Sequence, residues 1–436
     1  MIELTSGDLE EVLTLVTGQQ EETPGEILHV ARREQPSLVA TLLSAWEREG
    51  RDLGPALSHE LRQQRARTDF YRGLQAGLGR AWPEAVPLKG LEVADRYPDA
   101  LVRYMNDLDY WFPQRDRLWE AAGLLLADGW SMHTATFMLA GGDLQFLLSL
   151  RRLPEDPYAL PYGIELSTTP LVGDRIGVPV RTALPALCAD PVVKNLVALL
   201  FERFEQPYRA RDLVDAAVLL TGAPRRLLAS CALAVHELAL WPEYAELAAL
   251  LEESPFTVPR LPGDERALVR ASRMWRRATA ASGLRRPFGL AVTALQNGMV
   301  NGSAGMFGRR AWDAVSRRMS PRAALDAGLP LFALPVEGDD HRAEGLTLIE
   351  RGGVLWAHTP VGGFVLVHGD EIDEELLAGA KVAGGMREEP QEERAAGGMR
   401  EEPQEERAAG GMREEPQGER AAGGGREEPQ GKEDRG

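Results

Sequence analysis

The sequence predicts a fold of the α/β (α+β) class, in which helical regions flank a mostly mixed sheet. Three observations support this prediction. Apolar residues recur every three or four positions over the first 80 residues and again from about 190 to 320, which is the period of amphipathic helices. Between these regions, short apolar runs alternate with single helical segments, as in α/β proteins. Residues 328–372 then return to β-rich runs separated by Gly-Gly turns.

The expected elements follow from this pattern in chain order. Helices are predicted at residues 27–34, 37–49 and 56–82, where Pro and Gly separate the periodic runs. In the central region we expect a strand at residues 85–90, a brief helix at 91–99 that Pro98 stops, and a strand at 101–112. A helix at 115–130 that ends at Gly129, a hairpin at 131–150 and a last strand at 162–170 follow. The later region predicts helices at residues 190–204, 210–220, 225–240 and 264–281, and then a three-stranded meander.

The C-terminal segment is a repeat. GGMREEPQEERAA recurs with a period of 13 residues, which places Met386, Met399 and Met412 in register before a degenerate copy with Gly425. Each copy is charged and offers almost no apolar side chains, so we expect disorder rather than a stacked solenoid. We therefore expect a helical region at residues 1–80, a core at 81–185 and a helical domain at 186–325. A small β-rich domain at 326–380 and disordered repeats at 381–436 complete the predicted organisation.

Composition narrows the function classes. The formal net charge of −17 over 436 residues argues against a generally basic, nucleic-acid-binding surface. The two cysteines, Cys188 and Cys231, have no metal-ligand spacing and fit a reducing compartment. No apolar run has membrane-spanning length and the N-terminus lacks a signal core. We expect a cytoplasmic protein with no membrane partner.

Two aspartates stand inside an apolar run, RYMNDLDYWF. Side chains alternate along a strand, so Asp107 and Asp109 share one face, while Leu108 and Tyr110 share the other. A buried carboxylate needs a partner charge, a metal or a cleft. A solvated edge strand is the alternative explanation of the pair.

The surrounding residues favour a site. Lys89 and Gly90 lie where a strand gives way to a helix, a junction that offers backbone N–H groups to phosphate. Only four lysines occur in the chain, which suggests that Lys89 is needed as lysine. Arg103 precedes the aspartates and is expected either to neutralise phosphate or to pair with a carboxylate. Glu165 adds a carboxylate on a later strand, and three carboxylates on neighbouring strands can hold two Mg²⁺ ions.

With these residues in place, PLKGLEVADRYPDALVRYMNDLDYWFP resembles the core of the DNA polymerase beta-like nucleotidyltransferase superfamily. The closest resemblance is to uncharacterised bacterial nucleotidyltransferase family proteins with a Leu-Lys-Gly, Arg, Asp-x-Asp pattern, over roughly residues 80 to 220. The resemblance implies a polymerase beta-like core in which Gly90 cradles the triphosphate. Asp107, Asp109 and Glu165 would then be the metal-binding and catalytic carboxylates. Lys-Gly replaces the Gly-Gly or Gly-Ser of many relatives, and Ser-Thr-Thr follows Glu165 where close relatives often have a His and an aromatic residue.

The expected function is Mg²⁺-dependent transfer of an NMP from an NTP, such as ATP, to an acceptor hydroxyl, with release of pyrophosphate. Lys89, Gly90 and Arg103 would bind the nucleotide. The acceptor would be a small molecule, a peptide or a protein, and a long nucleic acid is the least favoured. Two alternatives stay open: an inactive scaffold that binds a nucleotide or a partner, and a toxin-like transferase that acts on tRNA.

Other polar clusters have simpler explanations. Arg211 and Asp215 lie four residues apart on a predicted helix, so they can pair locally, although they could also line a nucleotide pocket. His358 and His368 end strands of the predicted meander, near Asp339, Asp340 and His341. Turn chemistry explains these histidines better than a metal site does.

Overall fold

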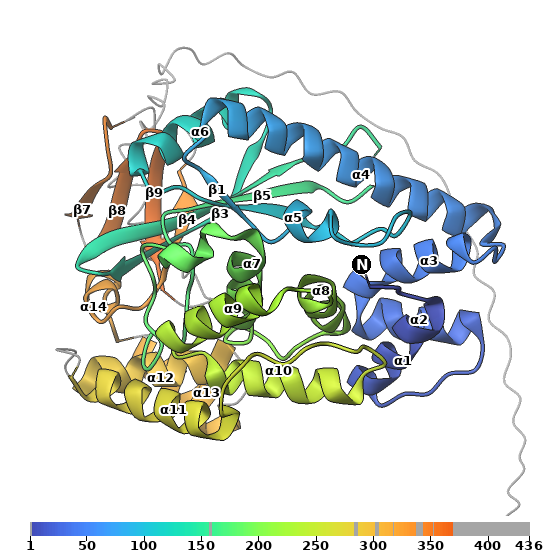
Figure 1. The fold of residues 1–436 in the computed structure, drawn as a ribbon. Coiled ribbons are helices and arrows are strands. Elements are labelled where there is room, and N and C mark those ends of the chain that lie inside the picture. The colour runs from blue at the N-terminus through green and yellow to red at the C-terminus, as the bar shows by residue number, and fades with distance from the viewer. Residues whose placement is uncertain are drawn as a thin grey trace, which may run out of the picture. The chain divides into compact units, whose positions relative to one another are not determined.

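A nine-stranded mixed sheet is the centre of the structure, a computed structural model that describes residues 2–368 except 157–158, 283–286, 301–304, 317, 337–342 and 352 (Figure 1). The strands are ordered β1-β2-β5-β4-β3-β6-β9-β8-β7. Their bounds are β1 Val86–Leu88, β2 Asp107–Trp111, β3 Ser131–Ala140, β4 Asp143–Arg152, β5 Tyr162–Ser167, β6 Leu331–Pro335, β7 Thr347–Arg351, β8 Val354–Thr359 and β9 Gly362–Val367.

Every neighbouring pair of strands in this sheet is antiparallel except β2 and β5, which are parallel. The β3–β4 hairpin turns through Gly141 and Gly142, whose φ angles of 64° and 87° suit a tight two-residue turn. The α+β class and the mixed sheet predicted from the sequence are confirmed.

The N-terminal helices and those of the core cover the sheet and its edge. They are α1 Ser6–Thr17, α2 Pro24–Glu34, α3 Val39–Arg48, α4 Gly54–Ala81, α5 Leu91–Ala94 and α6 Arg115–Ala127. Capping boxes begin two of them: Thr5 pairs with Asp8 at α1, and Thr23 with Glu26 at α2. Figure 1 shows the long α4 and α6 along one side of the sheet, with α7 to α10 along the other.

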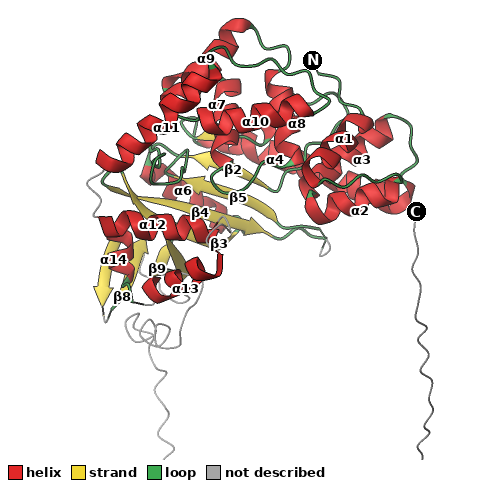
Figure 2. Ribbon diagram, turned by 90° about the horizontal axis from the view of Figure 1, so that it is seen from below, coloured by secondary structure: helices red, strands yellow, loops and turns green. Residues whose placement is uncertain are grey.

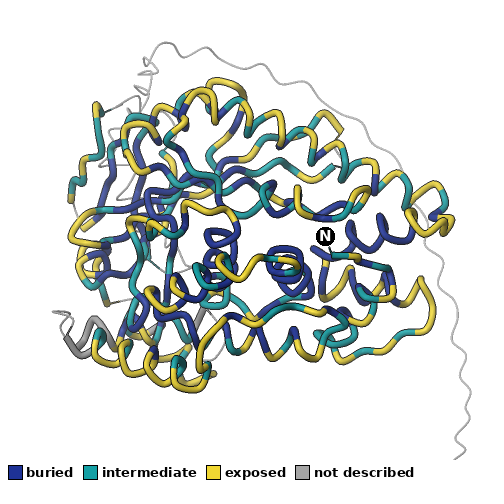
Figure 3. The backbone as a smooth tube through the Cα atoms, in the orientation of Figure 1, coloured by how far each residue is buried: buried dark blue, intermediate teal, exposed yellow. Residues whose placement is uncertain are grey.

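The remaining helices follow β5 in the chain. They are α7 Pro191–Glu202, α8 Ala210–Leu220, α9 Arg225–Glu237, α10 Trp241–Glu253, α11 Glu265–Ser282, α12 Pro287–Val300, α13 Gly305–Ser316 and α14 Pro321–Asp326. Asp190 caps α7, its carboxylate accepting the backbone N–H of Val192 at 2.8 Å. Helices α7 and α8 are buried almost all round, which fits their largely apolar sequences (Figure 3).

The described residues form three apolar clusters, the smallest of them between β8 and β9. In the first, α1 to α3 pack with α7 to α10. In the second, α4 and α6 pack against the sheet, and Leu108 and Tyr110 of β2 belong to it. Because side chains alternate along β2, the face that carries Asp107 and Asp109 points the other way, toward α7 and α8.

The strand expected over residues 101–112 is shorter than predicted and begins only at Asp107. Side chains of α3 bind the preceding backbone instead. Thr41 Oγ1 donates to the carbonyl of Val102 at 2.9 Å, and the Val102 N–H donates to Ser44 Oγ at 2.9 Å. These bonds satisfy backbone groups that a strand would have paired.

The meander expected as a small separate domain continues the core sheet. Strand β6, which was not anticipated, pairs with β3 on one side and with β9 on the other. Figure 2 shows β8 and β9 following on from β3 and β4. Leu355, Phe364 and Leu366 of the meander are buried in the same apolar core as Leu108. The repeats after residue 381 lie outside the described residues. None of the described helices combines the length and apolar character needed to cross a bilayer.

Candidate functional site

The parallel pairing of β2 and β5 brings two of the predicted carboxylates together. Asp109 and Glu165 are direct register partners, and Asp107 is opposite Gly163 two positions earlier. All three carboxylates therefore lie on the face that points toward α7 and α8. No hydrogen bond or ion pair to the side-chain carboxylate of Asp109 or Glu165 is found among the described residues.

Gly163 leaves room for Asp107. A Cβ at position 163 would come within 3.1 Å of the Asp107 Cβ and 3.3 Å of the Asn106 carbonyl oxygen. A larger residue there would push the two strands apart at the site, so the glycine permits their close approach.

Two side chains of α4 fix the register of these strands. The Arg67 guanidinium donates to four carbonyls at 2.6–2.8 Å, two beside the start of β2 and two before β5, namely those of Met105, Asn106, Leu160 and Pro161. The Tyr71 hydroxyl donates to the Asn106 carbonyl at 2.5 Å and accepts the Gly163 N–H at 2.9 Å. Together they join the beginnings of both strands, which sets Asp109 opposite Glu165.

A strained turn presents Lys89 beside this pair. Leu88 is the register partner of Asp109 on β1, and Lys89 follows it. Lys89 and Gly90 both have φ of 56°, a conformation that is uncommon for lysine. The Lys89 N–H donates to Asn195 Oδ1 of α7 at 2.6 Å, which helps to hold the turn. The helix predicted after the turn is present, but α5 is only 4 residues long.

Lys89 is paired with a residue that the sequence did not single out. Its Nζ lies 2.5 Å from Glu202 Oε1 at the end of α7. Burial lowers the pKa of Lys89, but the negative charges of Glu202 and Asp109 outweigh this effect and raise the pKa overall. The ammonium is therefore charged at neutral pH and close to the carboxylate pair.

The carboxylates themselves titrate far above their ordinary range. Burial, and then the charge of Asp107, raise the pKa of Asp109 to about 7. Burial, followed by the charges of Asp109 and Asp107, raises the pKa of Glu165 to about 8. Lys89 opposes both shifts. Carboxylates held close without a cation between them show this behaviour, and such groups cluster at functional sites.

Arg103 does not reach these carboxylates. Its Nη2 donates to Asp215 Oδ2 at 2.7 Å and its Nε to Oδ1 at 2.9 Å, and the Tyr97 hydroxyl donates to the same carboxylate at 2.6 Å. The Arg103 and Asp215 side chains are each only 5% exposed. Of the two roles expected for Arg103, the structure shows pairing with a carboxylate. That carboxylate, Asp215, lies on α8 and not on β2.

Arg211, at the beginning of α8, lies between three carboxylates without a close bond to any of them. Its nitrogens are 3.8 Å from Glu202, 3.7 Å from Asp212 and 4.0 Å from Asp215. The buried Nε has no hydrogen-bond partner in the described part of the chain. The pairing of Arg211 with Asp215 expected from their spacing is thus present but long.

The donor set suits a hard cation. Mg²⁺ prefers oxygen ligands and is usually bound by one or two carboxylates together with substrate phosphates, rather than by a complete protein cage. Asp109 and Glu165 face each other with raised pKa values and without a cationic hydrogen-bond partner. Nowhere in the described ranges do three His, Cys, Asp or Glu side chains form a ready-made metal group. Any divalent cation held by this pair would need further ligands from outside it.

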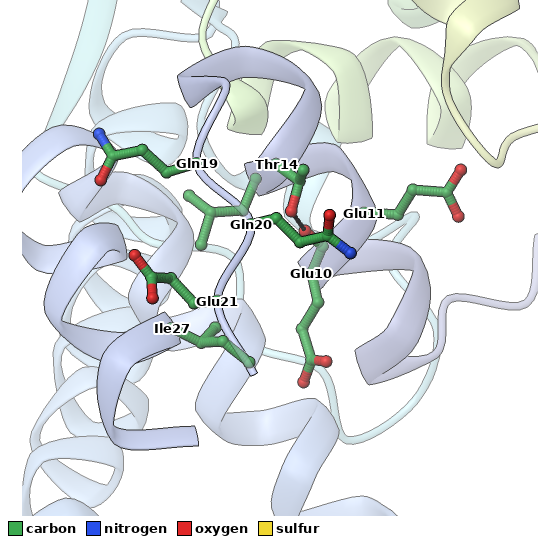
Figure 4. A pocket seen from close by; sticks show the side chains of 8 residues that line it. Glu10, Glu11, Thr14, Gln19, Gln20, Glu21 and Ile27 are labelled. Atoms are coloured by element: carbon green, nitrogen blue, oxygen red, sulfur yellow. Dashed lines mark hydrogen bonds between the residues drawn. The ribbon is translucent and has the colours of Figure 1, made fainter. Parts of the chain in front are cut away.

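Two cavities lie away from this cluster. One of about 260 Å³ lies beside α1, and Figure 4 shows the glutamates and glutamines that surround it. The other, of about 400 Å³, lies between α4 and residues 94–103, and Arg103 is part of its wall. Neither cavity is lined by Asp107, Asp109 or Glu165.

No contact between His358 and His368 is found within the described ranges. His358 stacks on Trp356, and His368 Nε2 lies 2.5 Å from the Ser316 carbonyl oxygen. The acidic residues at 339 and 340 and His341 lie outside the described residues.

Sequence reasoning missed Arg67, Tyr71, Asn195 and Glu202. The only signal was a weak one, since Glu202 ends an otherwise apolar helical run and Arg67 is one of many arginines in the chain. Comparison with known proteins adds nothing to this site: the chain matches no protein-family model, no curated protein and no solved structure.

Proposed function

We propose that the protein is a Mg²⁺-dependent nucleotidyltransferase with a polymerase beta-like core, which transfers an NMP from an NTP to an acceptor hydroxyl. The observation that supports this most is the pairing of Asp109 with Glu165 on parallel strands, on the same face as Asp107 and beside Lys89. Placing like charges close together destabilises the folded protein, and such groups are concentrated at functional sites, where a bound cation can compensate them.

Asp107, Asp109 and Glu165 are the residues that would hold Mg²⁺. When bound, the ion supplies charge stabilisation at the reacting phosphoryl group. The protein's own contribution is to fix the carboxylates, through Arg67 and Tyr71, before the ligand arrives.

In the proposed reaction the oxygen of the acceptor hydroxyl bonds to the α-phosphorus. The bond from that phosphorus to the bridging oxygen of the β-phosphate breaks, and pyrophosphate leaves with the electron pair. Glu165 takes the proton of the acceptor hydroxyl if it acts as the base, and water takes this proton if Glu165 is a metal ligand. Lys89 holds the β- and γ-phosphates through its ammonium.

The charges near the site favour a small or cationic acceptor over a nucleic acid. Glu202 lies next to Lys89. Burial raises the pKa of the nearby Glu205; Lys89 opposes this rise, and the charge of Glu202 adds to it. Carboxylates this close to the site would repel a polyanionic strand. The proposal is therefore a transferase that acts on a small molecule, a peptide or a protein.

The test combines binding with turnover. Calorimetry should show that NTP binds with Mg²⁺ to the natural chain and loses this Mg²⁺ dependence in Asp109→Asn. Asp128→Asn is the matched control, since Asp128 pairs with Arg152 at 2.9 Å on an exposed surface. Pyrophosphate release should follow the same order. If NTP binds with the same affinity with and without Mg²⁺ in all three proteins, the proposed function is wrong.

A further inference from the structure

Glu202 is placed like a ligand rather than like an ordinary helix residue. It is the last residue of α7, where the exposed carbonyls of the helix give a partial negative charge. No basic residue lies in the last turn of α7 to offset this charge. A carboxylate at this position has no local stabilisation, so its location depends on cations from elsewhere in the fold.

Two cations provide that stabilisation, one on each carboxylate oxygen. Lys89 Nζ lies 2.5 Å from Glu202 Oε1, and Arg211 Nη2 lies 3.8 Å from Oε2. The Glu202 side chain is 15% exposed, Arg211 17% and Lys89 24%, so all three are shielded but reachable. One anionic group thus bridges a lysine on the strained turn and an arginine on α8.

In this bridge the guanidinium of Arg211 makes only long ion pairs. Its three ion pairs are all 3.7 Å or longer, and its buried Nε has no hydrogen-bond partner within the described ranges. A buried guanidinium nitrogen without a partner is costly, whereas a phosphate group can accept two parallel bonds from one guanidinium. The unpartnered Nε lies nearest to Asp215, at 4.0 Å, whereas Nη2 lies 3.8 Å from Glu202 and is the nitrogen that an anion in the place of the Glu202 carboxylate would meet first.

We infer that Lys89 and Arg211 form a polyphosphate-binding site, and that Glu202 occupies it in the absence of ligand as an internal substitute for phosphate. The inference rests on the proposed function for the identity of the ligand, a nucleoside triphosphate. The incoming phosphate groups displace the Glu202 carboxylate toward solvent and take over both cations. Glu202 thereby weakens binding while keeping the two cations compensated when the site is free.

This arrangement predicts that removing the charge of Glu202 tightens polyphosphate binding. The probe is sodium tripolyphosphate, measured by calorimetry without Mg²⁺ at constant ionic strength. Glu202→Gln should bind it about tenfold more tightly than the natural chain, the order of one charge interaction near a surface. The matched control is Glu246→Gln, because Glu246 pairs with Arg203 at 2.8 Å on the surface and has no ion pair to Lys89 or Arg211 among the described residues. It should leave the affinity unchanged.

A second pair of variants tests the other half of the site in a chain with Glu202 intact. Arg211→Gln should weaken tripolyphosphate binding about tenfold. Arg203→Gln removes a nearby arginine, which pairs with Glu246 at 2.8 Å on the surface, and should have no such effect. These variants decide the question if Glu202→Gln does not fold.

Tighter binding in Glu202→Gln together with specific weakening in Arg211→Gln supports the site. Equal affinity in Glu202→Gln and the natural chain, or equal losses in Arg211→Gln and Arg203→Gln, overturns it, as does a lack of binding to every folded variant. The proposed function fails separately: the phosphate site stands if tripolyphosphate binds as expected while no Mg²⁺-dependent NTP binding occurs. A chain that binds NTP with Mg²⁺ but ignores the Glu202 change keeps the function and loses this inference.

Discussion

At the scale of single residues, the carboxylates of β2 and β5 decide how stability depends on pH. The pKa of Asp109 is raised from 3.8 to about 7, so between these values the folded metal-free protein keeps a proton that the unfolded chain releases. Stability should therefore fall as pH rises through this interval. Glu165 acts in the same direction, with a pKa raised from 4.5 to about 8.

Asp109→Asn should remove this penalty and abolish nucleotidyl transfer. We expect the variant and the natural chain to unfold at the same temperature near pH 4, and the variant to be the more stable by pH 8 in the absence of metal. Thermal melts across this pH range, with and without Mg²⁺ and NTP, provide the measurement. A variant that is less stable at every pH would show that Asp109 has a structural role, and the metal-site assignment would have to be abandoned.

Lys89→Arg tests whether the ammonium itself is needed. The guanidinium keeps the charge but is larger and planar, and Lys89 meets Glu202 from a backbone with φ of 56° that leaves little freedom to adjust. We expect weaker triphosphate binding by calorimetry and an unchanged circular dichroism spectrum. Equal affinity of the two proteins would leave Lys89 with no more than a structural role.

At the scale of elements, the parallel pair β2–β5 depends on α4. Tyr71→Phe removes a hydroxyl that bridges the Asn106 carbonyl and the Gly163 N–H, and leaves each of these partly buried bonds unmade. This should cost about 1–3 kcal/mol of unfolding free energy. It should also lower Mg²⁺-dependent NTP affinity, since the carboxylates lose their fixed spacing. Urea unfolding and calorimetry together check both effects, with Phe70→Leu as a control on the neighbouring position of α4. A stability loss without any change in affinity would contradict the register argument.

The elements were largely predictable from periodicity, but their partners were not. Asp107, Asp109 and Glu165 stand out because charges interrupt apolar runs, and that local signal was sufficient to choose them. Glu202 and Arg67 belong to helices in which charged residues are ordinary, so only their contacts across more than ninety residues of chain reveal a role. Likewise, residues 101–106 have the composition of a strand, but the side chains of α3 compete successfully for their backbone groups.

At the scale of the whole molecule, the continuity of the sheet predicts opposite effects on stability for two truncations of the chain. Ending the chain after Lys381 removes the charged repeats, whose sequence offers almost nothing to bury, and the melting temperature should barely change. Ending it after residue 325 removes β6 to β9, exposes the edge of β3 and takes Leu331, Phe364 and Leu366 from the core. Each lost burial costs about 1.5–3 kcal/mol, so the sum approaches typical total stability and the shorter chain should not fold.

Circular dichroism melts of the two truncated proteins provide this comparison. A cooperative transition in the chain that ends at residue 325 would mean that the meander is a separate domain after all. A large drop in melting temperature on removal of the repeats would mean that they contact the folded chain.

The β3–β4 hairpin lies at the middle of the sheet, with β5 on one side and β6 on the other. Hairpin contacts are local in sequence and form quickly, whereas the β2–β5 pairing closes a loop of about fifty residues and β3–β6 a far longer one. We therefore expect the hairpin to belong to the folding nucleus and the carboxylate pair to assemble late. Substitutions in Phe137 or Phe146 should slow refolding, while those at Asp109 should change mainly the rate of unfolding. A nascent chain that binds NTP would then exist only after α8 has been synthesised, because Arg211, which completes the proposed phosphate site with Lys89, lies on that helix.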